Sequence, residues 1–242
     1  MTEASIDSLP MLVLEHIFHF VRPYRSLDSA RCVNSQWRDV VDDCVRHMKR
    51  RFSACTHLTW HSIGEKLYSE SFSAYISERG GHAARYSRSD NCMYMFGGCT
   101  ARYVPLADMW RLNMDSLEWQ RIIQQGEIPP ARSLCTLLDC GDLLVLFGGY
   151  AKSSNNPINQ NVQFFGDLYF FLKNEQRWIN LTNESTPTLA SHGAVILKNR
   201  FMVVTGGSTG EDFSDDVYIC DLANQSWSIV YCAGWALIFS SK

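Results

Sequence analysis

The sequence contains no apolar run of the roughly 20 residues that a membrane-spanning helix requires. Residues 229–239 are apolar but too few to cross a bilayer. Charges of opposite sign nearly balance, because the net charge of the 242 residues is −3 at pH 7, so no general attraction to nucleic acid follows. Residues 1–9 hold acidic and polar side chains where a secretory signal peptide has a basic start and an apolar core, so we expect no signal peptide there. Neither a membrane nor a nucleic acid is therefore expected as a partner.

The sequence also lacks the motifs on which common catalytic and metal sites depend. The pair Gly97-Gly98 is not accompanied by the Lys and Ser or Thr of a phosphate-binding loop, and no Ser-nucleophile elbow is present. Cys55, His57 and His61 are close in sequence, but no second ligand pair at zinc-site spacing accompanies them. The 9 cysteines are irregularly spaced, which indicates reduced thiols in a cytoplasmic or nuclear protein. We expect no cofactor, no metal and no catalytic residue, so the chain is not predicted to be an enzyme.

One pattern, in contrast, recurs three times. In each copy an apolar run ends in a Gly pair, an Asp follows, and a Trp lies eleven residues after that Asp. Repeats of about 50 residues with a Gly pair after an apolar run are typical of kelch repeats, each of which forms one blade of a propeller. The motif residues are Gly97, Gly98, Asp108, Trp119, Gly148, Gly149, Asp167, Trp178, Gly206, Gly207, Asp216 and Trp227.

Each copy has physical reasons to fold as a small sheet. An apolar run bounded by Gly, such as Leu143–Phe147, indicates a strand that is buried on both faces. The Gly pair permits backbone angles that a side chain would block and lets a neighbouring segment approach. We expect the Asp to hydrogen-bond local backbone in the returning turn and the Trp to lie as an apolar plate between adjacent blades. One such sheet cannot bury both faces alone, so the blades must stack.

The connections between the second and third strands of the three copies differ in length and composition. They cover residues 99–107, 150–166 and 208–215, and the middle one is the longest and the most polar. Variable loops on a rigid scaffold commonly carry recognition, so the middle connection is the candidate substrate-binding loop. Its candidate contact residues are Ser153, Asn155, Asn156, Asn159 and Asn161.

The first 51 residues have the periodicity of helices. Between Pro10 and Pro23, apolar residues recur at steps of three and four, which marks one face of a helix that begins near the first proline and ends before the second. A second short helix is predicted over residues 26–33, and a third from residue 34 or 35 to residue 51. Three helices with short links form a small bundle. The apolar face of the first helix consists of Met11, Leu14, Ile17, Phe18 and Val21.

The sequence therefore predicts a mixed fold with separate α and β domains. A three-helix domain covers residues 5–51, a connector that packs on the first blade covers 52–81, and an all-β, kelch-type incomplete propeller of about three four-stranded blades covers 82–242. The repeats are assigned to residues 82–128, 129–190 and 191–228. Closed propellers have ~4–8 blades. We therefore interpret the chain as a fragment, splice form or truncated gene model of a longer protein, and expect its apolar tail to cover the third blade.

The N-terminal helices resemble the F-box over about residues 5–50. The spine of that family is a Leu-Pro opening, a Leu and an Ile-Phe pair on the first helix, a proline-containing turn, and a Val and a Trp near the third helix. The sequence departs from the family at Met11 and Leu12, where an acidic residue is usual. It thereby loses an interaction with the helix N-terminus of ~0.3–1 kcal/mol. The matching residues are Leu9-Pro10, Leu14, Ile17-Phe18, Pro23, Val33 and Trp37.

An F-box followed by kelch repeats resembles the F-box/kelch proteins, and this resemblance covers residues 5–228. It implies that the helical domain docks on a Skp-type adaptor, and through it on the cullin and RING proteins of an SCF-type ubiquitin ligase. It also implies that the blades bind a protein substrate for ubiquitination. The residues expected to contact the Skp adaptor are Leu9, Pro10, Leu14, Ile17, Phe18, Leu27 and Trp37.

Two other functions are compatible with the same sequence. The chain is then either a kelch-type interaction scaffold without a ligase role, or a truncated form that binds the adaptor but no substrate. An enzymatic function resembling that of copper-binding kelch propellers would need His and Tyr gathered at one end of a closed ring. The 7 His of this sequence are scattered, which argues against that function.

Overall fold

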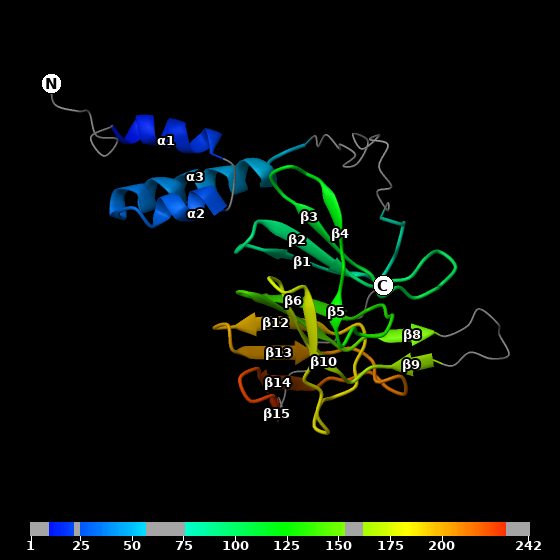
Figure 1. Cartoon of the computed structure of the whole chain (residues 1–242). Coiled ribbons are helices and arrows are strands. Elements are labelled where there is room, and N and C mark those ends of the chain that lie inside the picture. The colour runs from blue at the N-terminus through cyan, green and yellow to red at the C-terminus, as the bar shows by residue number, and fades with distance from the viewer. Residues whose placement is uncertain (1–9, 22–24, 57–75, 153–161, 231–242) are drawn as a thin grey trace, which may run out of the picture. The chain divides into compact units, whose positions relative to one another are not determined.

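The computed structural model describes residues 10–21, 25–56, 76–152 and 162–230 (Figure 1). The chain divides into two compact units, Met1–Ile63 and Gly64–Lys242. The first unit is helical and the second consists of β-sheets, as the sequence predicts. Within the described residues, none of the helices combines the length and the apolar character needed to traverse a bilayer. Eight cysteines fall in this part of the chain, and all eight are free thiols.

Three helices form the first unit: α1 (Met11–Phe20), α2 (Arg25–Arg31) and α3 (Ser35–Ser53). The backbone carbonyl of Pro10 accepts hydrogen bonds from the first turn of α1, so the proline stands directly before the helix. Helix α3 begins where the Asn34 side chain accepts a hydrogen bond of 2.8 Å from the backbone N–H of Trp37, which is an N-cap. The core of this unit consists of Leu14, Phe18, Leu27, Ala30, Val40, Val41 and Cys44.

The second unit contains three antiparallel sheets, here called blades 1, 2 and 3. Blade 1 has the strand order β1 (Ala83–Ser87), β2 (Cys92–Phe96), β3 (Met109–Asn113) and β4 (Trp119–Ile122). Blade 3 has the order β12 (Gly193–Leu197), β13 (Phe201–Thr205), β14 (Val217–Asp221) and β15 (Ser226–Val230). Both match the predicted four-stranded blade.

Blade 2 has the same four antiparallel strands and one addition. Its order is β6 (Thr136–Cys140), β7 (Leu143–Phe147), β10 (Leu168–Leu172) and β11 (Arg177–Asn180), and the short β5 (Gln125–Gly126) pairs in parallel with β11. The additional strand comes from the segment that leaves blade 1, so it links the two blades. A separate pair, β8 (Tyr150–Lys152) and β9 (Val162–Phe164), lies within the long connection between β7 and β10.

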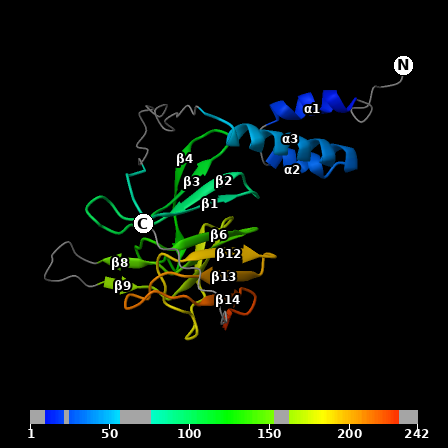
Figure 2. The ribbon, with the colours of Figure 1, turned by 180° about the vertical axis from the view of Figure 1, so that it is seen from behind.

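The three blades stack in chain order, and their first strands β1, β6 and β12 follow one another (Figures 1 and 2). Trp178 of blade 2 faces blade 1, where its ring lies 5.4 Å from that of Phe96. Trp227 of blade 3 likewise lies 5.1 Å from Phe147 of blade 2. The repeated Trp therefore faces the preceding blade, as the predicted apolar plate between blades requires.

Three backbone hydrogen bonds also join blade 1 to blade 2. The N–H of Gly98 donates to the carbonyl of Arg132 (2.8 Å), and the N–H of Arg132 donates to the carbonyl of Leu106 (3.1 Å). The N–H of Leu134 donates to the carbonyl of Gly81 (2.8 Å). A Cβ on Gly97, whose φ is +66°, would lie 2.5 Å from the Arg132 carbonyl oxygen, so only glycine permits this approach.

The same three bonds join blade 2 to blade 3. The N–H of Gly149 donates to Leu189 (2.8 Å), that of Leu189 to Phe165 (3.3 Å), and that of Ser191 to Leu134 (3.0 Å). A Cβ on Gly148 would lie 2.3 Å from the Leu189 carbonyl oxygen. The recurring glycine pair is therefore explained by blade-to-blade contact as well as by the turn that it makes.

Candidate protein-interaction sites

The helical unit contains an apolar cavity of about 410 Å³. Residues from all three helices and from the turns after α1 and α2 contribute to it. Trp37 closes one side, with its ring 5.1 Å from that of Phe18, and its Nε1 is buried without a hydrogen-bond partner in the described part of the chain. The lining residues are Leu14, Ile17, Phe18, Val21, Ser26, Ser29, Ala30, Val33 and Trp37.

Four of the residues expected to contact a Skp adaptor meet at this cavity, although their exposure differs. Leu14 and Phe18 are buried, Trp37 is half-buried, and Ile17 is 38% exposed. Leu27 is buried in the core of the unit and does not line the cavity. Pro10 is exposed, and Leu9 lies outside the described residues.

Further exposed apolar residues lie on α1, and the sequence analysis assigned none of them to adaptor contact. Leu12 is 78% exposed, and Met11 and Val13 are also exposed. The first turn of α1 has no acidic residue. Together with Ile17, these exposed apolar residues of α1 form what we call the α1 surface. Periodicity alone did not reveal it, because the predicted core face accounted for Met11 and left Leu12 and Val13 unassigned.

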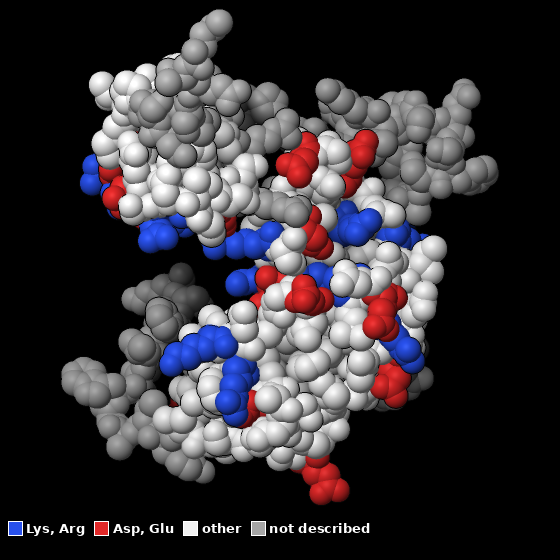
Figure 3. Space-filling model, turned by 60° about the vertical axis from the view of Figure 1, so that its left-hand side comes forward, with Lys and Arg blue, Asp and Glu red and all other residues white. Residues whose placement is uncertain are grey.

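Polar side chains also join α2 to α3. Arg31 of α2 donates to Asp42 of α3 and, at 3.3 Å, to Asp28 of its own helix. The hydrogen bond from Arg31 to Asp42 is the main reason why the pKa of Arg31 is raised. Over the face of the molecule in Figure 3, basic and acidic side chains are interspersed. That distribution agrees with the near-neutral net charge and favours a protein partner over a nucleic acid.

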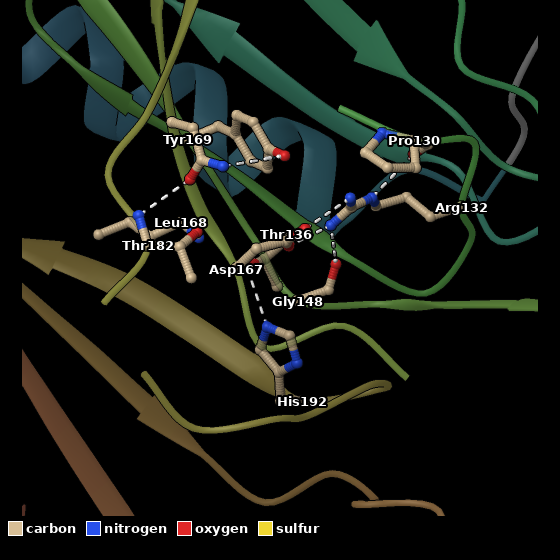
Figure 4. A network of polar contacts seen from close by, with 10 residues as sticks. Pro130, Arg132, Thr136, Gly148, Asp167, Leu168, Tyr169, Thr182 and His192 are labelled. Carbon is tan, nitrogen blue, oxygen red and sulfur yellow. Dashed lines mark hydrogen bonds and ion pairs between the residues drawn. The ribbon is translucent and has the colours of Figure 1, made fainter. Parts of the chain in front are cut away.

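In the blades, the repeated Asp has a partner that the sequence reasoning missed. Arg132 has no exposed side-chain surface and donates to both carboxylate oxygens of Asp167, with 2.8 Å for the Nη2–Oδ2 pair (Figure 4). It also donates to the carbonyls of Pro130 (3.0 Å) and Gly148 (3.1 Å), and its guanidinium lies 3.8 Å from the centre of the Phe165 ring. Side-chain pairing with an arginine therefore takes the place of the local backbone contacts expected for this Asp.

Blade 1 repeats the arrangement with Arg79 and Asp108. Arg79 donates to both carboxylate oxygens, at 2.5 Å and 2.9 Å, and to the carbonyl of Gly97 at 3.1 Å. Burial would raise the pKa of Asp108, but the hydrogen bonds from Arg79 and Trp110 outweigh it, so the pKa is lowered. The sequence feature that could have revealed these Arg–Asp pairs is an Arg in the segment that leads into each of the first two blades.

Blade 3 differs at this position. Leu189 stands where blades 1 and 2 have the arginine, and Asp216 instead accepts a hydrogen bond of 3.1 Å from the Tyr218 hydroxyl. His192 lies nearby, between blades 2 and 3, where its Nε2 is 3.0 Å from the Thr136 hydroxyl (Figure 4). Burial lowers the pKa of His192 to about 4, so this side chain is neutral at physiological pH.

The connections between second and third strands lie together at one end of the blades (Figure 1). The five candidate substrate residues, Ser153, Asn155, Asn156, Asn159 and Asn161, fall outside the described residues. In the described parts of all three connections, apolar side chains are exposed, and Phe213 is 90% exposed. These apolar side chains are Tyr103, Val104, Val162 and Phe213. The sequence prediction did not include them, because it was based on the polar residues of the longest connection.

A helical unit followed by stacked four-stranded blades is an architecture that typically serves in protein interaction. A family model described as "KLHDC2/KLHL20/DRC7 Kelch-repeats domain" matches residues 51–237, and an "F-box-like" model matches residues 6–54. The chain therefore belongs to this kelch-repeat family and carries an F-box-like segment at its N-terminal side.

Curated relatives share the kelch region at low identity. The chain is 26% identical over 150 residues to leucine-zipper-like transcriptional regulator 1 homolog of Drosophila melanogaster, which covers 58% of this chain and 14% of that protein. It is 26% identical over 165 residues to kelch domain-containing protein 10 of Xenopus tropicalis, a match that covers 62% of this chain and 37% of that protein. It is 30% identical over 110 residues to human host cell factor 2, a match that covers 44% of this chain and 13% of that protein. The chain thus spans well under half the length of these relatives.

Proposed function

We propose that the protein is the substrate-recognition adaptor of an SCF-type cullin–RING ubiquitin ligase, and not itself an enzyme. One observation carries the proposal: a single chain joins an F-box-like unit, with an open apolar cavity, to kelch blades that expose apolar side chains at one end. The first surface would dock on a Skp-type adaptor. The second would hold a protein substrate for ubiquitination and proteasomal degradation.

The α1 surface supports the docking step on physical grounds. Four apolar side chains on one helix remain in water, and their burial against a partner would be favourable at about 25 cal/mol per Å². Anchors of this kind dominate binding when the partner desolvates them fully. The cavity beside Ile17 offers space for a complementary apolar side chain of the adaptor.

We propose a likeness to F-box only protein 42 in the order of the domains and in the stretches around Leu9-Pro10, Gly97-Gly98 and Gly148-Gly149. A kelch scaffold without a ligase role would share the blades but would not need the α1 surface. Capture of a Skp adaptor therefore separates the two functions.

The test is co-purification of the full chain with a Skp-type adaptor and cullin. Leu12→Glu with Ile17→Glu places two charges on the α1 surface, and we expect capture to fall by roughly tenfold or more. Phe52→Glu is the matched control, because Phe52 is an exposed apolar residue of α3 that does not line the cavity, and it should leave capture unchanged. A circular dichroism melt of each variant checks folding. Equal capture by the double variant and the unsubstituted protein would contradict the proposal.

A further inference from the structure

The last two turns of α3 carry cations that no neighbouring acid balances. Arg46, Lys49, Arg50 and Arg51 are all exposed, and we call these four side chains the basic end of α3. The sequence contains no Asp or Glu from residue 44 to residue 64. This part of the chain therefore departs from the near-balance of charge over the whole sequence.

Ion pairing separates the first of these cations from the other three. Arg46 donates to the carboxylate of Asp43, one turn earlier on the helix. Among the described residues, the side chains of Lys49, Arg50 and Arg51 form no hydrogen bond and no ion pair. No acidic residue stands three or four positions from any of the three, and these are the spacings at which side chains of one helix meet. Three adjacent cations are thus left without a partner.

The helix itself explains only part of this arrangement. Cations near a helix C-terminus are favoured by ~0.3–1 kcal/mol, which accounts for Arg50 and Arg51 in the last turn. Arg50 stands four residues after Arg46, however, and like charges at this spacing oppose helix formation by ~0.2–0.5 kcal/mol. A carboxylate supplied by a partner would offset this repulsion and add an attraction of its own.

The basic end of α3 also borders a second cavity of the helical unit. This cavity, of about 410 Å³, is lined by side chains of α1 and α3, and all of them are polar. Arg46, His47 and Arg50 contribute to it from the second half of α3, Asp43 from the turn before, and Glu15 from α1. Because Asp43 is already paired with Arg46, Arg50 lines a space that could receive a carboxylate and has no described partner there.

The size of the basic end indicates the kind of partner. From Arg46 to Arg51 the helix rises ~8 Å, the length of roughly two or three residues of extended peptide. Asp39, Asp42 and Asp43 lie in the preceding turns and would repel a longer polyanion such as a nucleic acid or an anionic membrane. The net charge of −3 disfavours both of these as well. A short run of carboxylates on a protein fits the length and the charge.

We propose that the basic end of α3 binds a short acidic segment of a protein partner. One carboxylate of that segment enters the polar cavity and pairs with Arg50, and its neighbours pair with Lys49 and Arg51. The polar cavity shares no lining residue with the apolar cavity at Trp37, so this surface is distinct from the one proposed for the adaptor. The interaction therefore does not depend on the ligase role.

The test is fluorescence anisotropy of the full chain with a fluorescein-labelled peptide, Gly-Glu-Glu-Glu-Gly, and with its uncharged counterpart, Gly-Gln-Gln-Gln-Gly. Only the acidic peptide should bind. Arg50→Glu should weaken its binding roughly fivefold or more, because one attraction is lost and one repulsion is gained. Arg38→Glu is the matched control, because Arg38 is also exposed on α3 and the net charge changes equally, but it stands beside Asp39 outside the basic end. It should leave the affinity within about twofold.

Further measurements separate an acidic peptide from other anions. Raising the salt from about 0.05 M to about 0.5 M should weaken binding of the acidic peptide. Arg50→Gln, which removes one charge without adding another, should give a smaller loss than Arg50→Glu, and a circular dichroism melt of each variant checks folding. A DNA duplex and vesicles of phosphatidylserine with phosphatidylcholine should bind weakly, and equally to the unsubstituted and Arg50→Glu proteins.

Three results would each overturn the proposal. The first is that the acidic peptide binds no better than the uncharged one. The second is that Arg50→Glu and Arg38→Glu weaken its binding equally. The third is that the DNA or the vesicles bind more tightly than the acidic peptide and lose affinity on Arg50→Glu, which would assign the surface to a different class of partner.

Discussion

Blades 2 and 3 share a strand order and a backbone pattern but differ in the polar group beside the glycine pair. In blade 2, Asp167 is held by the fully buried Arg132, whereas in blade 3 Leu189 replaces the arginine and Asp216 has the Tyr218 hydroxyl as partner. The blade fold therefore does not require the ion pair. Replacing both members of a buried ion pair by apolar side chains often costs little stability. Removing only one member is costly, because the other charge stays buried without a partner.

The largest predicted effect comes from breaking the pair in blade 2. Arg132→Leu reproduces the residue of blade 3 but leaves Asp167 without its guanidinium and the carbonyls of Pro130 and Gly148 without a donor. We expect a loss of ~3–5 kcal/mol in the free energy of unfolding, measured by urea denaturation. Adding Asp167→Asn to the Arg132→Leu variant should recover part of the lost free energy of unfolding. A loss below about 1 kcal/mol for Arg132→Leu would show that the pair does not stabilise blade 2.

A second prediction concerns pH and the boundary between blades 2 and 3. His192 has a pKa of about 4 in the folded protein, below its ordinary value near 6.5, because burial disfavours the charged ring. Its contribution to stability is therefore present above about pH 6.5 and is lost as the pH falls through about 4. The expected loss is ~2–3 kcal/mol across that window.

His192→Asn should flatten this part of the stability profile, measured by thermal unfolding at a series of pH values. His82→Asn is the control, because His82 is the equivalent residue of blade 1 and is exposed. That variant should follow the profile of the unsubstituted protein. Identical profiles for His192→Asn and the unsubstituted protein would show that another group governs the acid response.

The smallest predicted difference compares the repeated Trp at the two internal boundaries. Trp178 donates from Nε1 to the Gln124 side chain at 2.7 Å, whereas the buried Nε1 of Trp227 has no partner in the described structure. Both Trp→Phe variants lose ring contacts, but only Trp178→Phe leaves a hydrogen-bond partner unpaired. We expect Trp178→Phe to cost ~1–3 kcal/mol more than Trp227→Phe in chemical denaturation. Equal losses would mean that Gln124 finds another partner.

Much of the fold could be predicted because it depends on neighbours close in sequence. The strand Leu143–Phe147 was located from its apolar run and its glycine boundary, and α3 was located from Asn34 and the apolar periodicity that follows it. The short β5 was missed, because two residues carry no periodicity and pair only when β11 is in place. The site residues were harder to assign, since Leu14 and Leu27 have the same pattern as Ile17 but lie in the core.

The sequence by itself determined the three helices and the blade repeat, because helix and strand periodicity and the backbone freedom of glycine act over a few residues. Only the tertiary structure decided which partners meet over longer distances. Asp167 pairs with Arg132 from 35 residues away in the chain, and Leu12 remains exposed whereas Leu14, on the same helix, is buried.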